Sequence, residues 1–262
     1  MKEHATIGIF DSGVGGTSIW KEIHALLPNE HTIYLADSKN APYGNKSAQE
    51  IIALSKKNSQ RLIDMGCKLI VVACNTATTN AIAVLRNTYD IPFVGIEPAI
   101  KPAALRTTTN AIGILATKGT LSSALFTKTS QLFAADTTVT EVVGEGLVPL
   151  IEQGAFESEA MDTLLKKYTQ PFIDANIDHL VLGCSHYPYL IPYLKKYLPE
   201  TVTIIDSGEA VARQTKYLLE KFDLRRPENT SAALKFYTNA EIDTLSFLLR
   251  EYRDAEIAKL DF

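Results

Sequence analysis

The sequence predicts an α/β protein made of two similar lobes, each a mostly parallel sheet flanked by helices. Short apolar stretches alternate with amphipathic stretches along the 262 residues, a pattern typical of parallel strands joined by helices that cover both faces of a sheet. Short motifs also recur at a near-constant offset of 105 to 110 residues. We therefore expect a pseudo-twofold pair of lobes, with the active site in the cleft where the carboxyl ends of their strands meet.

The strands are predicted from short apolar runs, whose length favours buried strands over helices. These runs fall at 6–10, 32–36, 69–73, 93–96, 111–115, 139–143, 179–182, 202–205 and 234–237.

The helices are predicted from capping motifs and periodicity. Ser47-Ala-Gln-Glu50 is a capping box that opens a helix running to about Met65, and Gly66 ends it. Amphipathic spacing predicts further helices over 121–133, 158–175, 189–198 and 208–222.

An internal repeat sets the predicted lobe boundaries. Its matched pairs are Gly8-Ile-Phe-Asp-Ser-Gly13 with Gly113-Ile-Leu-Ala-Thr-Lys118, Cys74 with Cys184, and Glu97 with Asp206. We expect a first lobe formed by residues 1–98 together with 207–262, and a second lobe formed by residues 99–206. The first lobe then carries Cys74 and the second carries Cys184.

These two cysteines are the most informative residues in the chain. Cys74 and Cys184 each end an apolar strand, and each is followed by small polar residues that begin a helix. One thiol from each lobe suits a reaction that removes a proton from one face of a carbon and returns a proton to the other face. The positive end of a helix would favour the thiolate at each position. Cys67, in Met65-Gly-Cys-Lys68, is not followed by small polar residues and is predicted to be a small buried residue or a partly exposed bystander.

A glycine-rich turn follows the first strand and is expected to line the cleft. Asp11 and Ser12 precede Gly13-Val-Gly-Gly16, which lacks the third glycine of a dinucleotide-binding loop. Asp11 would suit a ligand ammonium group, and the amides of the turn would suit a carboxylate. Thr17 is expected to cap the helix that follows. The alternative is a tight strand-to-helix turn with a capping aspartate.

Three further pairs of residues are candidate ligand contacts. Asn75 and Thr76 follow the first thiol, Ser185 and His186 follow the second, and Tyr43 and Gly44 lie in a turn. His186 would serve as a charge partner of the adjacent thiol, and a plain surface histidine is the alternative. Tyr43 and Gly44 would reach a ligand only if their loop overhangs the cleft. Histidine and cysteine spacings of the kind found in zinc sites are absent from the sequence.

Taken together, these motifs resemble the glutamate racemases of the cofactor-independent aspartate/glutamate racemase superfamily. The resemblance runs from about residue 7 to about residue 220, through Gly8-Ile-Phe-Asp-Ser-Gly-Val-Gly-Gly16, Pro42-Tyr-Gly44, Ala73-Cys-Asn-Thr-Ala77 and Gly183-Cys-Ser-His-Tyr-Pro188. The family has threonine where this chain has Ser185, which keeps the hydroxyl and loses a methyl group. Aspartate racemases usually carry glutamate where this chain has His186, so the resemblance favours glutamate.

The resemblance also implies roles for the candidate residues. Cys74 and Cys184 would be the two acid/base groups, assisted by Asp11 and His186 respectively, and Glu152 would be a further assisting acid. The implied product is D-glutamate for peptidoglycan. The implied substrate contacts are Asp11, Ser12, Tyr43, Gly44, Asn75, Thr76, Ser185 and His186.

The same reaction is expected to need neither cofactor nor metal. Many amino-acid racemases use pyridoxal phosphate as an electron sink, but no glycine-rich phosphate cup accompanies a lysine here. Without that sink, a thiolate and a neutral thiol must be held on opposite sides of the substrate in a desolvated site. Closure of the lobes over the substrate is therefore expected.

Composition limits the partners and the location of the protein. A chain that is 46% hydrophobic can bury a sizeable core, and a net charge of −4 argues against nucleic acid or an anionic membrane as the main partner. We expect a small-molecule substrate. Three cysteines do not suit a disulfide framework, and no signal peptide or membrane span is evident, which indicates a cytoplasmic protein. The sequence leaves the oligomeric state open and allows a homodimer.

Three other functions remain open at this stage. A thiol-redox protein would also use two cysteines, but within disulfide reach of each other. A non-catalytic amino-acid-binding regulator would keep the cleft and would not need both thiols. A sister racemase acting on aspartate is the nearest alternative.

Overall fold

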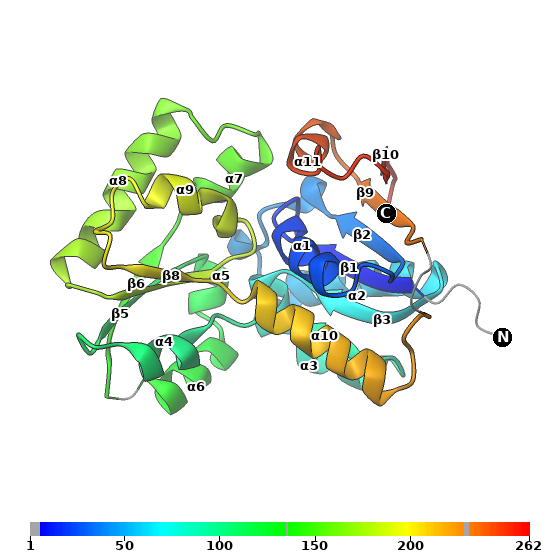
Figure 1. The fold of residues 1–262 in the computed structure, drawn as a ribbon, viewed down its shortest axis with the longest axis horizontal. Coiled ribbons are helices and arrows are strands. Elements are labelled where there is room, and N and C mark those ends of the chain that lie inside the picture. The colour runs from blue at the N-terminus through cyan, green and yellow to red at the C-terminus, as the bar shows by residue number, and fades with distance from the viewer. Residues whose placement is uncertain (1–5, 135, 228–230) are drawn as a thin grey trace.

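Two parallel sheets, each flanked by helices, form the protein (Figure 1). The computed structural model describes residues 6–134, 136–227 and 231–262. Strand order is β10-β9-β2-β1-β3-β4 in the larger sheet and β6-β5-β7-β8 in the smaller one. Each strand pairing within the described residues is parallel. The predicted α/β class with two flanked sheets is therefore confirmed.

The larger sheet is built from the two ends of the chain. Its strands are β1 (Thr6–Asp11), β2 (Thr32–Ala36), β3 (Cys67–Val72), β4 (Phe93–Gly95), β9 (Leu234–Thr238) and β10 (Ala255–Lys259). The helices that flank it are α1 (Thr17–Leu26), α2 (Ala48–Asp64), α3 (Asn75–Thr88), α10 (Gly208–Lys221) and α11 (Asp243–Leu248).

The smaller sheet comes from the middle of the chain. Its strands are β5 (Ala111–Ala116), β6 (Thr138–Val143), β7 (His179–Gly183) and β8 (Thr203–Ile205). Its helices are α4 (Ile100–Arg106), α5 (Lys118–Leu121), α6 (Ala124–Phe133), α7 (Leu147–Glu152), α8 (Glu159–Asp174) and α9 (Ile191–Leu194). Short 3-10 turns occur at η1 (Ser38–Asn40), η2 (Tyr43–Asn45) and η3 (Tyr187–Leu190).

The two sheets share one strand order, which supports the internal repeat. In chain order, the strands of each four-stranded unit lie as second, first, third and fourth: β2-β1-β3-β4 and β6-β5-β7-β8. Strands β9 and β10 extend the first unit beyond β2. We propose that the lobe boundaries lie where the repeat predicts them, at 1–98 with 207–262 and at 99–206, although residues 1–5 fall outside the described part.

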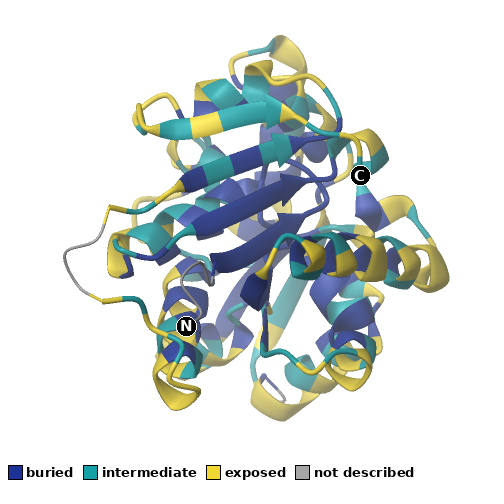
Figure 2. Cartoon of the chain, turned by 90° about the vertical axis from the view of Figure 1, so that its right-hand side faces the viewer, coloured by how far each residue is buried: buried dark blue, intermediate teal, exposed yellow. Residues whose placement is uncertain are grey.

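The burial of each strand explains whether it could be predicted from the sequence. All nine predicted strands are present within one or two residues of their predicted ends. β1 and β3 are buried along their whole length, as their continuous apolar runs require. β10 was missed because it is an edge strand of intermediate and exposed residues, including Glu256 and Lys259. Figure 2 shows the contrast between the dark central strands and the partly exposed edge.

Local hydrogen bonds decide the helix boundaries. The capping box of α2 is confirmed, since the Glu50 amide donates to Ser47 Oγ and the Ser47 amide donates to Glu50 Oε2. The helix predicted over 121–133 is instead two helices, because Ser123 Oγ accepts from the Phe126 amide and starts α6 there.

Two other helix predictions were wrong in detail. The stretch 189–198 forms the end of the 3-10 turn η3 and the four-residue helix α9, and Pro192 lacks the amide that one continuous helix through this stretch would need. Thr17 does not cap α1. Its hydroxyl donates backwards to the Val14 carbonyl at 2.6 Å, and Gly16 occupies the capping position.

No helix in the described ranges combines the length and the hydrophobicity needed to cross a bilayer.

A buried ion pair holds the base of the first sheet. Lys68 Nζ lies 2.6 Å from Glu30 Oε2, with side chains 4% and 3% exposed. The same ammonium group donates to the Leu224 carbonyl, and Glu30 Oε1 accepts from the Arg226 amide. The pair therefore fixes the segment that follows α10 to the start of β3.

We predict that Lys68→Met destabilises the protein by about 3–5 kcal/mol, because it leaves the Glu30 carboxylate buried without its partner. Urea denaturation measures the change. Lys259→Met is the control, since the Lys259–Glu241 pair is 57% and 81% exposed and its loss should cost less than about 1 kcal/mol. Equal effects of the two substitutions would contradict the assigned role of the buried pair.

Candidate active site

The two predicted cysteines occupy matching positions in the two sheets. Cys74 follows β3 and Cys184 follows β7, the third strand of each repeated unit. Both are free cysteines and both are buried, with 4% and 6% exposure. Cys74 is itself the N-cap of α3, where its sulfur accepts from the Ala77 amide at 3.4 Å. After Cys184 come the 3-10 turn η3 and the four-residue helix α9, so the second thiol does not cap a regular helix as Cys74 does.

The charge state of Cys74 differs from the one that the helix end alone would favour. Burial raises the pKa of the Cys74 thiol well above its usual range, and the nearby Asp11 carboxylate raises it further. The Ala77 amide and the Ser12 hydroxyl act in the opposite direction and are outweighed. Cys74 donates to Ser12 Oγ at 3.6 Å, as a neutral thiol does. Cys67 is also buried, which raises its pKa to about 12.

Asp11 is the fully buried end of β1 and organises the glycine-rich turn. Its Oδ2 accepts from the amides of Gly13 and Gly16 at 3.2 and 2.9 Å. Its Oδ1 accepts from Ser185 Oγ at 3.0 Å, which joins the two lobes. The expectation that the turn amides bind a ligand carboxylate is therefore wrong for these amides, because the protein's own carboxylate occupies them. Burial raises the pKa of Asp11, and the charge of His186 opposes that rise.

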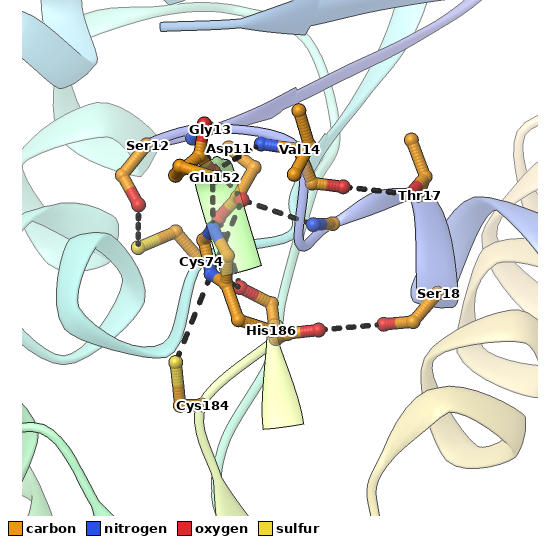
Figure 3. A network of polar contacts seen from close by, with 12 residues as sticks. Asp11, Ser12, Gly13, Val14, Thr17, Ser18, Cys74, Glu152, Cys184 and His186 are labelled. Carbon is orange, nitrogen blue, oxygen red and sulfur yellow. Dashed lines mark hydrogen bonds and ion pairs between the residues drawn. The ribbon is translucent and has the colours of Figure 1, made fainter. Parts of the chain in front are cut away.

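His186 connects the second thiol to a carboxylate. Its Nδ1 lies 3.8 Å from Cys184 Sγ, and its Nε2 lies 2.5 Å from Glu152 Oε1 (Figure 3). Burial alone would lower the pKa of His186, but contacts with Cys184, Glu152 and Asp11 raise it well above the usual value. His186 is thus a buried imidazolium rather than a surface histidine, with Asp11 Oδ2 also 4.0 Å away.

Glu152 reaches the site from the end of α7. Its Oε1 also accepts from the Val14 amide at 2.7 Å, and its Oε2 accepts from Ser38 Oγ at 2.6 Å. Burial would raise the pKa of Glu152, but the hydrogen bond and charge of His186 hold it below the usual value. An ionised Glu152 therefore neutralises the His186 cation.

Asn75 and Thr76 begin α3 beside Cys74. The side-chain nitrogen and oxygen of Asn75 are buried and have no hydrogen-bond partner among the described residues. A buried polar group without a partner is costly, so a polar ligand at this position would be stabilised. The Thr76 hydroxyl instead contacts Thr117 Oγ1 at 2.8 Å and Thr120 Oγ1 at 3.2 Å in the other lobe.

The loop of Tyr43 and Gly44 lies at the seam between the lobes. Gly44 is so close to Thr117 that an added Cβ would lie 2.9 Å from the threonine side chain, and both residues line a cavity of about 140 Å³. The Tyr43 hydroxyl does not face this cavity. It donates to Asp37 Oδ2 at 2.5 Å within the first lobe, so Tyr43 anchors the loop.

The structure brings most of the predicted residues together. Direct contacts join Asp11, Ser185, His186 and Cys184, and a separate contact joins Cys74 to Ser12, the residue after Asp11. Cys184 contributes to the raised pKa of Cys74, so the two thiols are within electrostatic reach. Sequence motifs did not reveal Ser38, Asp37 or Thr117, since each acts through the folded contacts of its loop. In the described ranges, no group of three histidine, cysteine or acidic side chains is arranged to hold a metal ion.

Sequence comparison assigns the chain to a family. The pattern of the family described as Asp/Glu/Hydantoin racemase matches residues 7–215. The chain belongs to this family. Among curated relatives, the glutamate racemase of Herpetosiphon aurantiacus is 43% identical over 235 residues, which cover 90% of this chain and 92% of the relative. The glutamate racemase of Pseudomonas putida KT2440 is 46% identical over 94% of this chain and 92% of its own.

Solved structures give the same result. Escherichia coli glutamate racemase, solved with L-glutamate and the activator UDP-MurNAc-Ala, has a TM-score of 0.87 and 34% identity, and the match covers 98% of both chains. Francisella tularensis glutamate racemase, solved with D-glutamate, has a TM-score of 0.83 and 29% identity over 100% of this chain and 99% of that one.

We predict that Glu152→Gln lowers the pKa of His186, because it removes the carboxylate that stabilises the imidazolium. In the wild type, His186 should stay charged through neutral pH, and in the variant it should lose its proton at lower pH. Histidine ring nitrogen NMR measures both titrations, with His24 as the internal control. An unchanged His186 titration would contradict the assigned pairing.

Proposed function

We propose that this protein is a glutamate racemase that interconverts L-glutamate and D-glutamate by proton transfer between Cys74, Cys184 and the α-carbon, without a cofactor. One observation carries the proposal: two free, buried thiols follow the third strand of two repeated units, and the consecutive residues Asp11 and Ser12 contact Ser185 beside one thiol and the sulfur of the other. A single active site formed by both lobes gives the two cysteines access to opposite faces of one carbon.

The chemistry requires one thiolate and one thiol. The α-hydrogen of an amino acid is a very weak acid, so a base must take it while a second group delivers a proton to the opposite face. The thiolate is the basic form of cysteine. Cys184 would deprotonate L-glutamate and Cys74 would deprotonate D-glutamate, as the family resemblance implies.

The charges around the thiols support a starting state for this cycle. Cys74 lies beside the Asp11 carboxylate and has a raised pKa, which favours the neutral thiol. Cys184 lies beside His186, whose Nδ1 is 3.8 Å from its sulfur. A neutral Cys74 is the form that donates a proton, which is the role that the proposal gives it when L-glutamate is the substrate.

Positioning and exclusion of water lower the barrier. Holding the reacting groups in place can supply roughly 7–11 kcal/mol, and a preorganised polar site stabilises the developing charge. Asn75 offers a buried amide without a protein partner for the substrate. Ser12, Thr76 and Ser185 add hydroxyls at the same seam. Gly44 lets the loop approach the second lobe closely.

We also propose a metabolic use for the product, a compartment and an oligomeric state. D-glutamate would supply peptidoglycan synthesis, and the three free cysteines are consistent with a reducing cytoplasm. A homodimer stays a prediction, which sedimentation velocity would test.

The direct test is a racemisation assay on purified, exhaustively dialysed protein with L-glutamate, D-glutamate and both enantiomers of aspartate. We expect turnover of glutamate in both directions, no requirement for added pyridoxal phosphate or metal, and much weaker turnover of aspartate. Restoration of a lost activity by pyridoxal phosphate would overturn the cofactor-free mechanism. Faster turnover of aspartate would identify the sister racemase, and binding without turnover would identify a regulator.

We predict that Cys74→Ser and Cys184→Ser each abolish racemisation in both directions, because a hydroxyl is far too weak an acid to replace a thiol. Circular dichroism of the two enantiomers follows the reaction. Cys67→Ser is the matched control, since Cys67 is buried beneath Gly8 away from the network and should be nearly neutral for activity. Full activity in either of the first two variants rules out the two-thiol mechanism.

A further inference from the structure

We propose that the segment 239–244 positions the active site, with Asn239 holding the loop 37–45 and Thr244 holding the end of α7 at Glu152. This role rests on the proposed racemase function. It assigns two positioning residues to a part of the chain that lies beyond the family match, which ends at residue 215.

Asn239 follows β9 directly and is almost fully buried. Its Nδ2 donates to Asp37 Oδ1 at 2.6 Å, and its Oδ1 accepts from the Lys39 amide at 2.9 Å. One side chain therefore satisfies both a buried carboxylate and a backbone amide of the same loop. A paired contact of this kind fixes the orientation of the loop as well as its position.

Asp37 connects Asn239 to the rest of the loop 37–45. Its Oδ2 accepts from the Tyr43 hydroxyl at 2.5 Å and from Asn58 Nδ2 at 3.3 Å, and its Oδ1 also accepts from Asn40 Nδ2 at 2.7 Å. The carboxylate thus joins both ends of the loop to α2 and, through Asn239, to β9. The loop ends at Gly44, which touches the second lobe.

Thr244 makes the corresponding contact to the second lobe. Its Oγ1 donates to the Glu152 carbonyl at 2.8 Å, from α11 in the first lobe to α7 in the second. Figure 1 shows α11 beside α7 at the junction of the two halves. Ser38, in the loop that Asn239 holds, donates to Glu152 Oε2. Glu152 is therefore held from two sides by the 239–244 segment. Thr244 contacts its carbonyl directly, and Asn239 holds the loop whose Ser38 contacts its carboxylate.

The same segments border a cavity of about 500 Å³. Ser38, Ala41, Glu152, Ala240 and Thr244 all contribute to its lining. The cavity separates parts of the loop, α7 and the 239–244 segment, and the hydrogen bonds of Ser38 and Thr244 to Glu152 connect them. Because Glu152 is one of the groups that raise the pKa of His186, a shift of Glu152 would change the electrostatic surroundings of Cys184.

The first test uses Asn239→Asp, which places a second carboxylate against Asp37. A neighbouring like charge makes the introduced carboxyl easier to protonate, and only its protonated form can donate to Asp37. The KM for glutamate should therefore be close to that of the wild type in mildly acidic buffer and rise about tenfold in mildly alkaline buffer. A KM that follows the wild-type pH profile would overturn the proposal.

A double variant that exchanges the two side chains tests whether their hydrogen bond can be restored. It also provides a second protein to measure if the single variant does not fold. In Asp37→Asn/Asn239→Asp the amide and the carboxylate exchange places, so their mutual hydrogen bond can form again. We expect the double variant to lose most of the pH dependence of KM seen in Asn239→Asp. If the single variant does not fold, the folded double variant is the one measured, and a strong remaining pH dependence of its KM counts against the proposal.

The second test concerns Thr244. Thr244→Val keeps the shape of the side chain and removes its hydroxyl, and it should lower kcat severalfold with little change in thermal stability. Thr244→Ser restores the hydroxyl and should restore kcat. Ser246→Ala, which also alters a half-buried hydroxyl residue of α11, is the control and should leave kcat unchanged. Equal kcat values for Thr244→Val and wild type would overturn the second half of the proposal.

A readout without turnover separates this inference from the proposed function. Asn239→Ala removes the acceptor of the Lys39 amide, so hydrogen exchange in peptides covering 38–45 should become faster while peptides of β1 and β3 stay protected. Exchange rates identical to those of the wild type would contradict the positioning role whatever the activity. A wild-type protein without racemase activity, but with faster exchange in the variant, would contradict the proposed function alone.

Discussion

The buried contact between Glu152 and His186 is the interaction on which the site depends. Together with Cys184 and Asp11, Glu152 raises the pKa of His186 at a position where burial alone would lower it. The same carboxylate accepts from the Val14 amide and the Ser38 hydroxyl, so one charge pair also joins the glycine-rich turn and the loop of the first lobe to the second lobe. The Glu152 side chain therefore both raises the pKa of His186 and holds the two lobes together.

That coupling gives the two thiols unlike surroundings in a pseudo-symmetric frame. Equivalent strands deliver Cys74 and Cys184, but a carboxylate stands beside the first and an imidazolium beside the second. A racemase must hold its two acid/base groups in opposite protonation states at any moment. The carboxylate and the burial that favour a neutral Cys74 suit one of these two states, that of the proton donor.

Much of this was predictable from the sequence, because the relevant signals are local. Continuous apolar runs reveal strands, Ser47 and Glu50 reveal a helix start, and paired motifs reveal the repeat. The rest depends on folded contacts. Edge strand β10 has no apolar run, Asn239 meets Asp37 across some two hundred residues, and the pKa of Cys74 is set by burial and Asp11 rather than by its helix end. Glu152 was found only by family resemblance.

The most direct measurement of the central claim is the origin of the proton at Cα. The reaction is started from pure L-glutamate in heavy water and stopped early. Two thiols on opposite faces predict that the first D-glutamate carries deuterium, because the donating thiol has exchanged with solvent, while unreacted L-glutamate keeps its original hydrogen. A single base moving between faces would carry original hydrogen into the product. Substantial protium at Cα of early D-glutamate would contradict the two-thiol account.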